Sequence, residues 1–359
     1  MSKSPTETQG AHVSGPSETL RESGAWQESV GRYARPDLRR TLWALASSVV
    51  PFIALWVLMY LALSVSYFLT LALAVPATAF LLRIYMLFHD CTHGSLLRSR
   101  RANARVGAVL GFFVFTPFAR WRYEHTMHHA TASDLDRRGT GDMMTLTVDE
   151  YEARSRGARL KYRLYRSPLV MFGIGPVWSM VLSPRWVPRG SRPEIKRSVL
   201  GLDVALVVVF GALCWWLGWR DVLLVQAPFI WLAGGAGIWL FYVQHQFSNT
   251  YWQRSPDWTY ADAAMRGSSY LHLPRVLQFV TANIGFHHVH HLSPKIPNYH
   301  LQRVHDANPM FDDVSRLTFW EALGTVRLKL WDDETGRLVT WADARRRSSH
   351  HASPAFAPS

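Results

Sequence analysis

Two long apolar blocks dominate the pattern of hydrophobic and polar positions along the chain. Residues 41–88 contain a single charged side chain, Arg83, and residues 199–242 are broken by the charged pair Arg220 and Asp221. A helix crosses the roughly 30 Å hydrocarbon layer of a membrane with about 20 apolar residues. Each block therefore has room for two spans joined by a tight turn, which we place near residues 42–61, 67–88, 199–219 and 222–243.

Two shorter apolar runs lie between these blocks. Residues 106–118 (VGAVLGFFVFTPF) and 168–178 (PLVMFGIGPVW) contain Gly and Pro and are too short to cross a membrane. The pattern is typical of interfacial or re-entrant segments, and buried helices of a soluble region are the alternative. We favour the interfacial interpretation.

The two ends of the chain differ from the apolar blocks in composition. Residues 1–40 are polar, lack the apolar core of a secretory signal, and are expected to form a partly disordered arm. Residues 341–359 end in ARRRSSHHASPAFAPS and are expected to form a disordered tail. Residues 41–340 then form one membrane domain.

Basic residues gather on one predicted side of the membrane. The chain has a formal net charge of +13, and of its basic residues only Arg220 lies in a predicted hairpin turn. The positive-inside rule then places both termini and the polar blocks in the cytoplasm. Such a face suits lipid headgroups or an acidic protein partner. No nucleic-acid motif accompanies the charge, so we expect no nucleic-acid partner. The predicted fold is an all-α integral membrane protein with four spans in two hairpins, capped by a cytoplasmic helical domain.

Histidines cluster close to the predicted cytoplasmic ends of the spans. On a helix, residues three and four apart differ by roughly 60° and 40° in azimuth, so the patterns H-x-x-x-H and H-x-x-H-H each place their imidazoles on one stripe. Three such helices would bring eight imidazoles to one place, and a further histidine at the end of the fourth span would add a ninth. The histidines concerned are His89, His93, His125, His128, His129, His245, His287, His290 and His291.

The number and type of these ligands favour two redox-active metal ions. Eight or nine imidazoles are too many for one ion, and structural zinc sites take four ligands, usually with thiolates. The two cysteines, Cys91 and Cys214, are interpreted as buried or free thiols. A pair of irons accepts electrons and activates O₂, which zinc cannot do. His288 is out of phase with its neighbours, and the isolated His12, His272, His300 and His305 are interpreted as ordinary core or surface residues.

The motifs HDCTHGS, HTMHH and HHVHH, in this order around two hairpins, resemble the three histidine boxes of membrane fatty acid desaturases. The segments RYARPDLRRTLW, GDMMTLTVDEY, YVQHQF and TANIGFHHVHH extend the resemblance to bacterial delta-12 (omega-6) acyl-lipid desaturases, over about residues 25–340. Thr92 in the first box stands where many relatives carry Gly. Carried onto this chain, the family's iron ligands are the nine histidines named above.

The resemblance implies a reaction, a cofactor and partners. A lipid acyl chain, O₂, two electrons and two protons would give a cis alkene and two waters at a di-iron centre. No haem segment like that of cytochrome b5 is recognisable, so the electron donor is expected to be a separate ferredoxin or cytochrome b5-like protein. Carboxylates should hold the imidazoles in the right tautomer. Asp90 and Glu124, which flank two of the boxes, are the candidates.

Three other interpretations remain open at this point. Another membrane di-iron oxidase, such as a fatty acyl hydroxylase, a carotenoid ketolase or hydroxylase, or a sphingolipid desaturase, shares the iron chemistry. An intramembrane zinc protease is suggested by HDCTH, which differs by one residue from H-E-x-x-H. A metal transporter would carry its site near the middle of the bilayer, where the predicted spans have no histidine.

Overall fold

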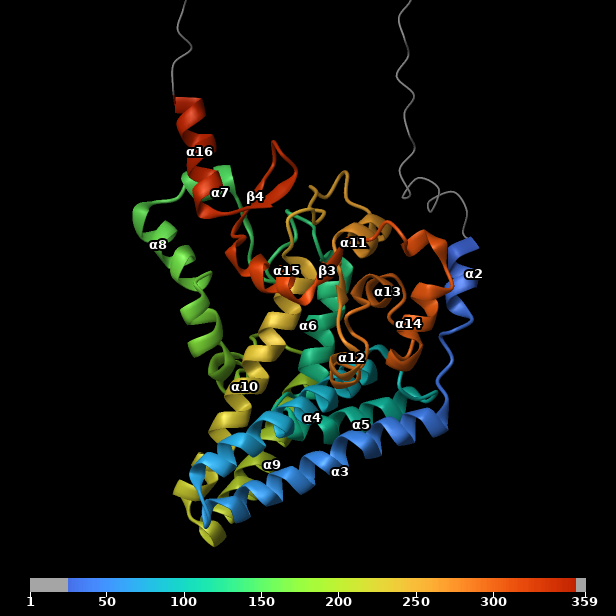
Figure 1. Ribbon diagram of the computed structural model, residues 1–359, viewed down its shortest axis with the longest axis vertical. Helices are drawn as coiled ribbons and strands as arrows, with labels where there is room; N and C mark the ends of the chain where they lie inside the picture. Colours follow the sequence, from blue (N-terminus) through green and yellow to red (C-terminus); the bar gives the residue numbers. More distant parts are fainter. Residues whose placement is uncertain (1–24, 353–359) are drawn as a thin grey trace, which may run out of the picture.

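The computed structural model describes residues 25–352 and is mostly helical, as predicted (Figure 1). Four of its helices are long and apolar enough to cross a membrane, which confirms the predicted number of spans. Each begins earlier or ends later than the pattern of apolar residues suggests, because polar residues extend the helices beyond the hydrocarbon layer. These helices are α3 (Leu38–Leu63), α4 (Tyr67–His93), α9 (Pro193–Leu217) and α10 (Trp219–His245).

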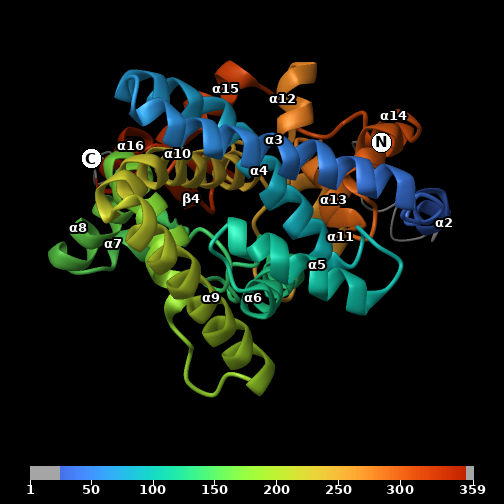
Figure 2. The same cartoon turned by 90° about the horizontal axis from the view of Figure 1, so that it is seen from below.

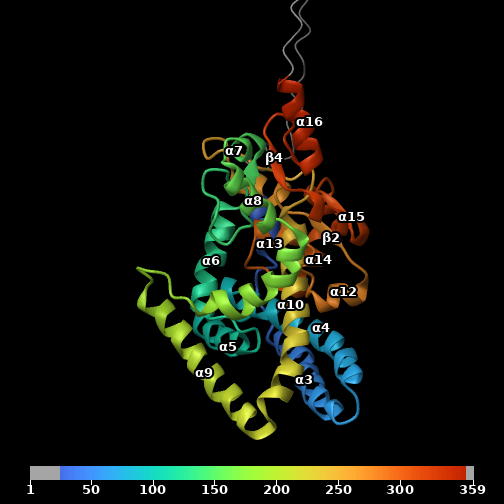
Figure 3. The same cartoon turned by 90° about the vertical axis from the view of Figure 1, so that its left-hand side faces the viewer.

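The four long helices form two hairpins whose turns lie at the same end of the molecule (Figures 1 and 3). The second turn is a single residue, Gly218, at φ +86°. Helices α4 and α10 pack inside the bundle, whereas α9 leans away from the other three (Figure 2). Protein buries only 11% of the apolar stretch of α9. Exposing this apolar surface to water would cost much free energy, so lipid must cover it.

The opposite end of the bundle carries a cap of short elements. Its strands are β1 (Leu146–Thr147), β2 (Tyr270–His272), β3 (Arg316–Thr318), β4 (Leu330–Asp332) and β5 (Arg337–Val339). Strand β1 pairs with β4 in parallel and β4 with β5 antiparallel, while β2 and β3 form a separate parallel pair. The cap helices are α7 (Val148–Glu152), α11 (Tyr260–Arg266), α12 (Arg275–Val280), α13 (His287–Leu292), α14 (Asn298–Asp306) and α15 (Phe319–Gly324), with single turns at Pro309–Phe311 and Thr325–Arg327.

Both short apolar runs belong to sharply bent helix pairs. The first joins α5 (Arg100–Phe113) to α6 (Phe118–Thr131) at an angle of 102°. The second joins α8 (Arg156–Tyr165) at 52° to π-helical turns over Val170–Ile174 and Val177–Leu182 and a single turn at Ser183–Arg185. Arg185 at its end forms an ion pair with Asp203 of α9, which ties the bent segment to the third span.

The prediction of disorder is wrong for the first part of the C-terminal tail, because residues Trp341–Ala352 form helix α16. Arg347 pairs with Asp332 at 2.9 Å and with Asp149 at 3.1 Å, and Trp341 packs against Tyr151 at a centroid distance of 5.2 Å. Asp149 and Tyr151 lie far away in the sequence, so the composition of the tail could not reveal these two contacts. Within the N-terminal arm, Ala25–Gly31 forms helix α2.

Candidate metal centre

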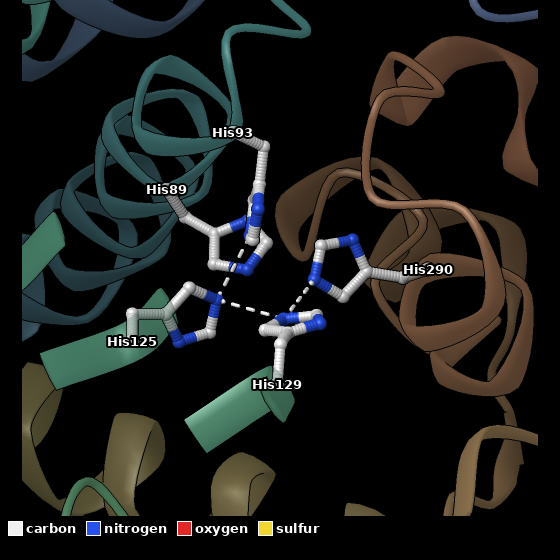
Figure 4. A group of neighbouring side chains, drawn as sticks. All are labelled: His89, His93, His125, His129 and His290. Carbon is white, nitrogen blue, oxygen red and sulfur yellow. Dashed lines mark hydrogen bonds between the residues drawn. The ribbon is translucent and has the colours of Figure 1, made fainter. Parts of the chain in front are cut away.

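All nine predicted histidines meet where α4 and α10 enter the cap, and they divide into two groups. The ligand nitrogens of each group lie within 4.8 Å of one another. Four separate helices supply the rings. The first group, shown in Figure 4, is His89, His93, His125, His129 and His290, and the second is His128, His245, His287 and His291.

Helical phase explains the division. In α6, His125 and His129 are four residues apart and share one group, whereas His128 turns to the other. In α13 the arrangement is reversed, because His287 and His291 share the second group and the residue between them, His290, joins the first. The sequence predicts one stripe per helix, and the structure shows that each H-x-x-H-H cluster serves both groups.

The rings of the first group point their Nε2 atoms at one another (Figure 4). The Nε2 atom of His125 lies 2.9 Å from that of His93 and 3.1 Å from that of His129, and His129 lies 3.0 Å from His290. His89 completes the group at a centroid distance of 4.4 Å from His290. The five rings therefore enclose a common point.

The second group converges in the same way on His245. Its Nε2 atom lies 3.1 Å from that of His128 and 2.9 Å from that of His287. His291 packs beside them, with its ring 4.8 Å from that of His245. All four residues are buried.

The partners of the outer ring nitrogens show what must lie between these rings. His128 donates its Nδ1 proton to Asp142, and His245 donates its own to the carbonyl oxygen of Gly267 at 3.1 Å. A neutral imidazole carries one proton, so both Nε2 atoms are then bare lone pairs that face each other. Neither can donate to the other, whereas a cation between them would satisfy both. The donor set therefore fits a metal ion in this group.

The charge state of the rings in α13 agrees with this fit. Burial lowers the pKa of His287, His290 and His291, and neighbouring imidazoles lower the pKa of each further. These rings are neutral at physiological pH, so their lone pairs are available to a metal ion. Imidazole nitrogens suit iron, zinc or copper by softness, and the division of the nine into sets of five and four suits two ions.

Of the two predicted carboxylates, one contacts an imidazole and the other does not. Asp90 lies 3.4 Å from Nδ1 of His89 and accepts hydrogen bonds from the backbone and side-chain amides of Asn298. Glu124 instead pairs with Arg120 one helical turn earlier, at 2.9 Å. Glu124 sits next to His125 in sequence, but on a helix adjacent residues point in different directions.

Sequence reasoning missed Asp142, which holds His128. The only sign of this role in the local sequence is the Gly-Asp pair that begins GDMMTLTVDEY. The glycine of this pair, Gly141, adopts φ +75°. A Cβ at Gly141 would lie 2.7 Å from the carbonyl oxygen of Glu124 and 3.1 Å from Cβ of His128. Glycine is needed at this position because the loop passes so close to α6.

The remaining histidines within the described residues lie outside both groups. His288 is fully buried, but its Nε2 faces Nδ1 of His305 at 3.0 Å. His300 packs against Tyr33 and Tyr299. His12 lies outside the described residues.

An apolar cavity of about 480 Å³ leads to the histidines. It touches the first group through His89 and His125 and the second through His287. Its walls come from α4, α6, α10 and the π-helical turns, and include Leu81, Tyr85, Trp121, Trp178, Met180, Ala233 and Phe241. Arg120, Glu124 and Asp142 are its charged lining residues.

Comparison with known proteins identifies the family of this chain. The family model for fatty acid desaturases matches residues 64–322. The chain belongs to the fatty acid desaturase family. A protein named fatty acid desaturase from Bacillus subtilis is 42% identical over 314 residues, which cover 88% of this chain and 89% of that protein. The chain is therefore a membrane oxidoreductase of this family, and the protease and transporter interpretations lose their support.

More distant desaturases share shorter stretches. The sn-1 oleoyl-lipid 12-desaturase of Synechocystis sp. is 27% identical over 224 residues, covering 62% of this chain and 63% of that protein. The sn-1 acyl-lipid omega-3 desaturase (ferredoxin) of the same organism is 26% identical over 260 residues, covering 67% of this chain and 68% of that protein.

Proposed function

We propose that this desaturase introduces a cis double bond at the delta-12 position of an oleoyl group in a membrane lipid. The nine histidines would hold two iron ions, O₂ would be the co-substrate, and a separate protein would supply electrons. The observation that carries the proposal is that one apolar cavity of about 480 Å³ reaches both histidine groups, through His89, His125 and His287.

The chain's own residues would position the substrate and exclude water. Leu81, Ala233 and Met180 form an apolar wall that favours methylene groups over water. Trp121 lines the cavity and stacks on His125 at a centroid distance of 4.3 Å, which fixes that ring from behind. Phe241 packs against His128 at a centroid distance of 5.1 Å, with the two rings tilted.

The overall reaction defines what the metal must supply. An unactivated methylene pair cannot be attacked by side-chain acids or bases, so bound iron would supply the oxidising power drawn from O₂. Two C–H bonds break and one C=C bond forms. The two hydrogens, two further protons and two donor electrons reduce O₂ to two waters.

The position of the new bond is inferred from relatives and not from geometry. The Synechocystis protein named as an oleoyl-lipid 12-desaturase supports oleoyl as substrate and delta-12 as position. The side chain of Trp178, which lines the cavity and is also exposed, supports entry from the membrane, because Trp favours the lipid–water interface.

A small acidic electron carrier, such as a ferredoxin or a cytochrome b5-like protein, would dock on the cap. The net charge of +13 and the near absence of basic residues from both hairpin turns support a basic cytoplasmic cap. The ferredoxin in the name of the second Synechocystis relative supports the same kind of donor.

Expression in a host whose lipids are rich in oleate tests the proposal, with fatty acid profiling by mass spectrometry. We expect a new linoleate peak that depends on O₂ and is lost in a His287→Ala variant. A product that gains one oxygen would identify a hydroxylase instead. An unchanged profile from iron-loaded protein, supplied with a reduced donor, would overturn the proposal.

A further inference from the structure

One face of α10 forms a wall of the cavity. Its lining residues include Ala233, Gly234, Gly237, Phe241 and Gln244. At about 100° per residue, Gly237 lies in the middle of this stripe, between the directions of Ala233 and Phe241. A side chain at Gly237 would therefore point into the cavity.

The glycines of this stretch have different structural explanations. At Gly234, a Cβ would lie 2.7 Å from Cβ and 2.8 Å from Cα of Pro176, so close helix packing requires glycine. At Gly237, a Cβ would meet nothing within 4 Å. Glycine inside a helix is roughly 0.5–1 kcal/mol less favourable than alanine. Packing against Pro176 therefore explains why residue 234 is glycine, whereas no contact within the protein explains why residue 237 is glycine.

We propose that Gly237 determines specificity by leaving room for the methyl end of the acyl chain. This rests on the proposed function, in which an acyl chain fills the cavity. Gly237 precedes His245 by eight residues, or about 12 Å along the helix axis, so it acts on carbons well removed from the reacting pair.

The polarity of the cavity sets the direction of the chain. Its charged lining residues, Arg120, Glu124 and Asp142, come from α6 and the loop that follows it. The stretches of α4 and α10 nearer the hairpin turns contribute apolar residues, Leu81 and Ala233 among them. The ester end of a lipid therefore stays near α6, and the methyl end extends past Gly237.

Substitution of Gly237 by larger residues tests this assignment. We expect Gly237→Leu to lower the conversion of oleoyl relative to palmitoleoyl chains, which are shorter at the methyl end, by roughly tenfold or more, and Gly237→Ala to shift the same ratio less. Gly235→Leu and Gly235→Ala are matched controls. Gly235 is on the same helix, about 160° around from Gly237. Its Cβ would lie 4.0 Å from Pro176, and we expect the wild-type ratio.

The outcomes separate this inference from the proposed function. An unchanged ratio in Gly237→Leu and Gly237→Ala proteins with wild-type iron content overturns the inference and leaves the function intact. If the leucine variant does not accumulate, the alanine and Gly237→Ser variants decide. If wild-type protein makes no product, the rise in unfolding temperature on adding oleate is compared with the rise on adding palmitoleate. This comparison reports how well each chain fits the cavity without turnover. Loss of the preference for oleate in Gly237→Ala would then support the inference, and its retention would refute it.

Discussion

Asp142 accepts the Nδ1 proton of His128 from a loop that lies beyond the end of α6. The bond fixes the tautomer that leaves Nε2 of His128 free to face His245. Carboxylates in this position orient a metal-binding imidazole and raise its basicity. We expect Asp142→Asn to weaken iron binding about 10–100-fold, measured as iron retained per chain against a chelator series.

Asp136→Asn is the matched control for this prediction. Asp136 lies in the same loop, but its carboxylate pairs with Arg254 at 2.7 Å instead of with an imidazole. We expect it to keep wild-type iron. Equal iron retention in the Asp142 and Asp136 variants would show that Asp142 does not support His128.

Gly141 is the second point at which this loop controls the site. Its φ of +75° and the approach of a Cβ to 2.7 Å from the Glu124 carbonyl oxygen both oppose any side chain. Gly141→Ala should cost about 1–3 kcal/mol of strain, expressed as a displaced loop and lost iron. Gly139 also has a positive φ, +109°, but a Cβ there would meet only Cε of Met144, at 3.4 Å, so Gly139→Ala is the control. Iron content of the Gly139 variant should exceed that of the Gly141 variant.

The sequence predicts the spans and the clustering of the histidines because both depend on local patterns. Apolar runs of the right length predict four spans, and helical spacing predicts that the histidines converge, although each H-x-x-H-H cluster divides between the two groups. The cap brings these patterns together, but its contacts are long-range. His128 meets His245 across 117 residues, so the division into two groups depends on tertiary packing.

The errors have the same origin. The place of Glu124 beside His125 predicts a contact with that ring, yet the direction of Glu124 on α6 leads to Arg120. The role of Asp142 depends on how a loop returns to α6, which no local pattern in the sequence indicates. The composition of the tail predicts disorder because it takes no account of Asp149, which pairs with Arg347 from 198 residues earlier in the chain.

His245 tests whether the histidine outside the three boxes belongs to the site. Its Nε2 lies within 3.1 Å of two other Nε2 atoms of the second group. We expect His245→Ala to lose about half of the iron, since the first group keeps all five of its rings. His288→Asn should keep the wild-type iron content, although it removes a buried ring that contacts His305. Mössbauer spectra and metal analysis of both variants give the comparison, and full iron in His245→Ala would remove it from the ligand set.

Electron delivery to a basic cap should depend on salt. The net charge of +13 attracts an acidic carrier over a distance that shrinks to about 10 Å at 0.1 M ionic strength. We expect the second-order rate of oxidation of reduced ferredoxin to fall steeply as salt rises. Reduction of the same protein by a neutral chemical mediator is the control and should change little. A flat salt profile with ferredoxin would rule out electrostatic steering.

Lys329 provides a pH-dependent test of the cap. It is 4% exposed and donates to the backbone oxygen of Arg166 at 2.5 Å, beside that buried guanidinium. Burial, together with the charge of Arg166, lowers the pKa of Lys329 to about 8. Below this pH the folded protein holds a charge that its surroundings disfavour. Between pH about 8 and about 10, the unfolded chain keeps a proton that the folded protein has lost, so stability contributed by this site rises with pH.

Lys329→Met removes this titration. Relative to wild type, the variant should be most favoured near neutral pH, and its advantage in the midpoint of thermal unfolding should shrink as the pH rises through that window. The lost hydrogen bond to Arg166 shifts the whole curve by a constant and does not change its slope. Lys161→Met, at an exposed lysine of α8, should show no such trend. A difference between wild type and Lys329→Met that is independent of pH would mean that Lys329 titrates as an ordinary lysine.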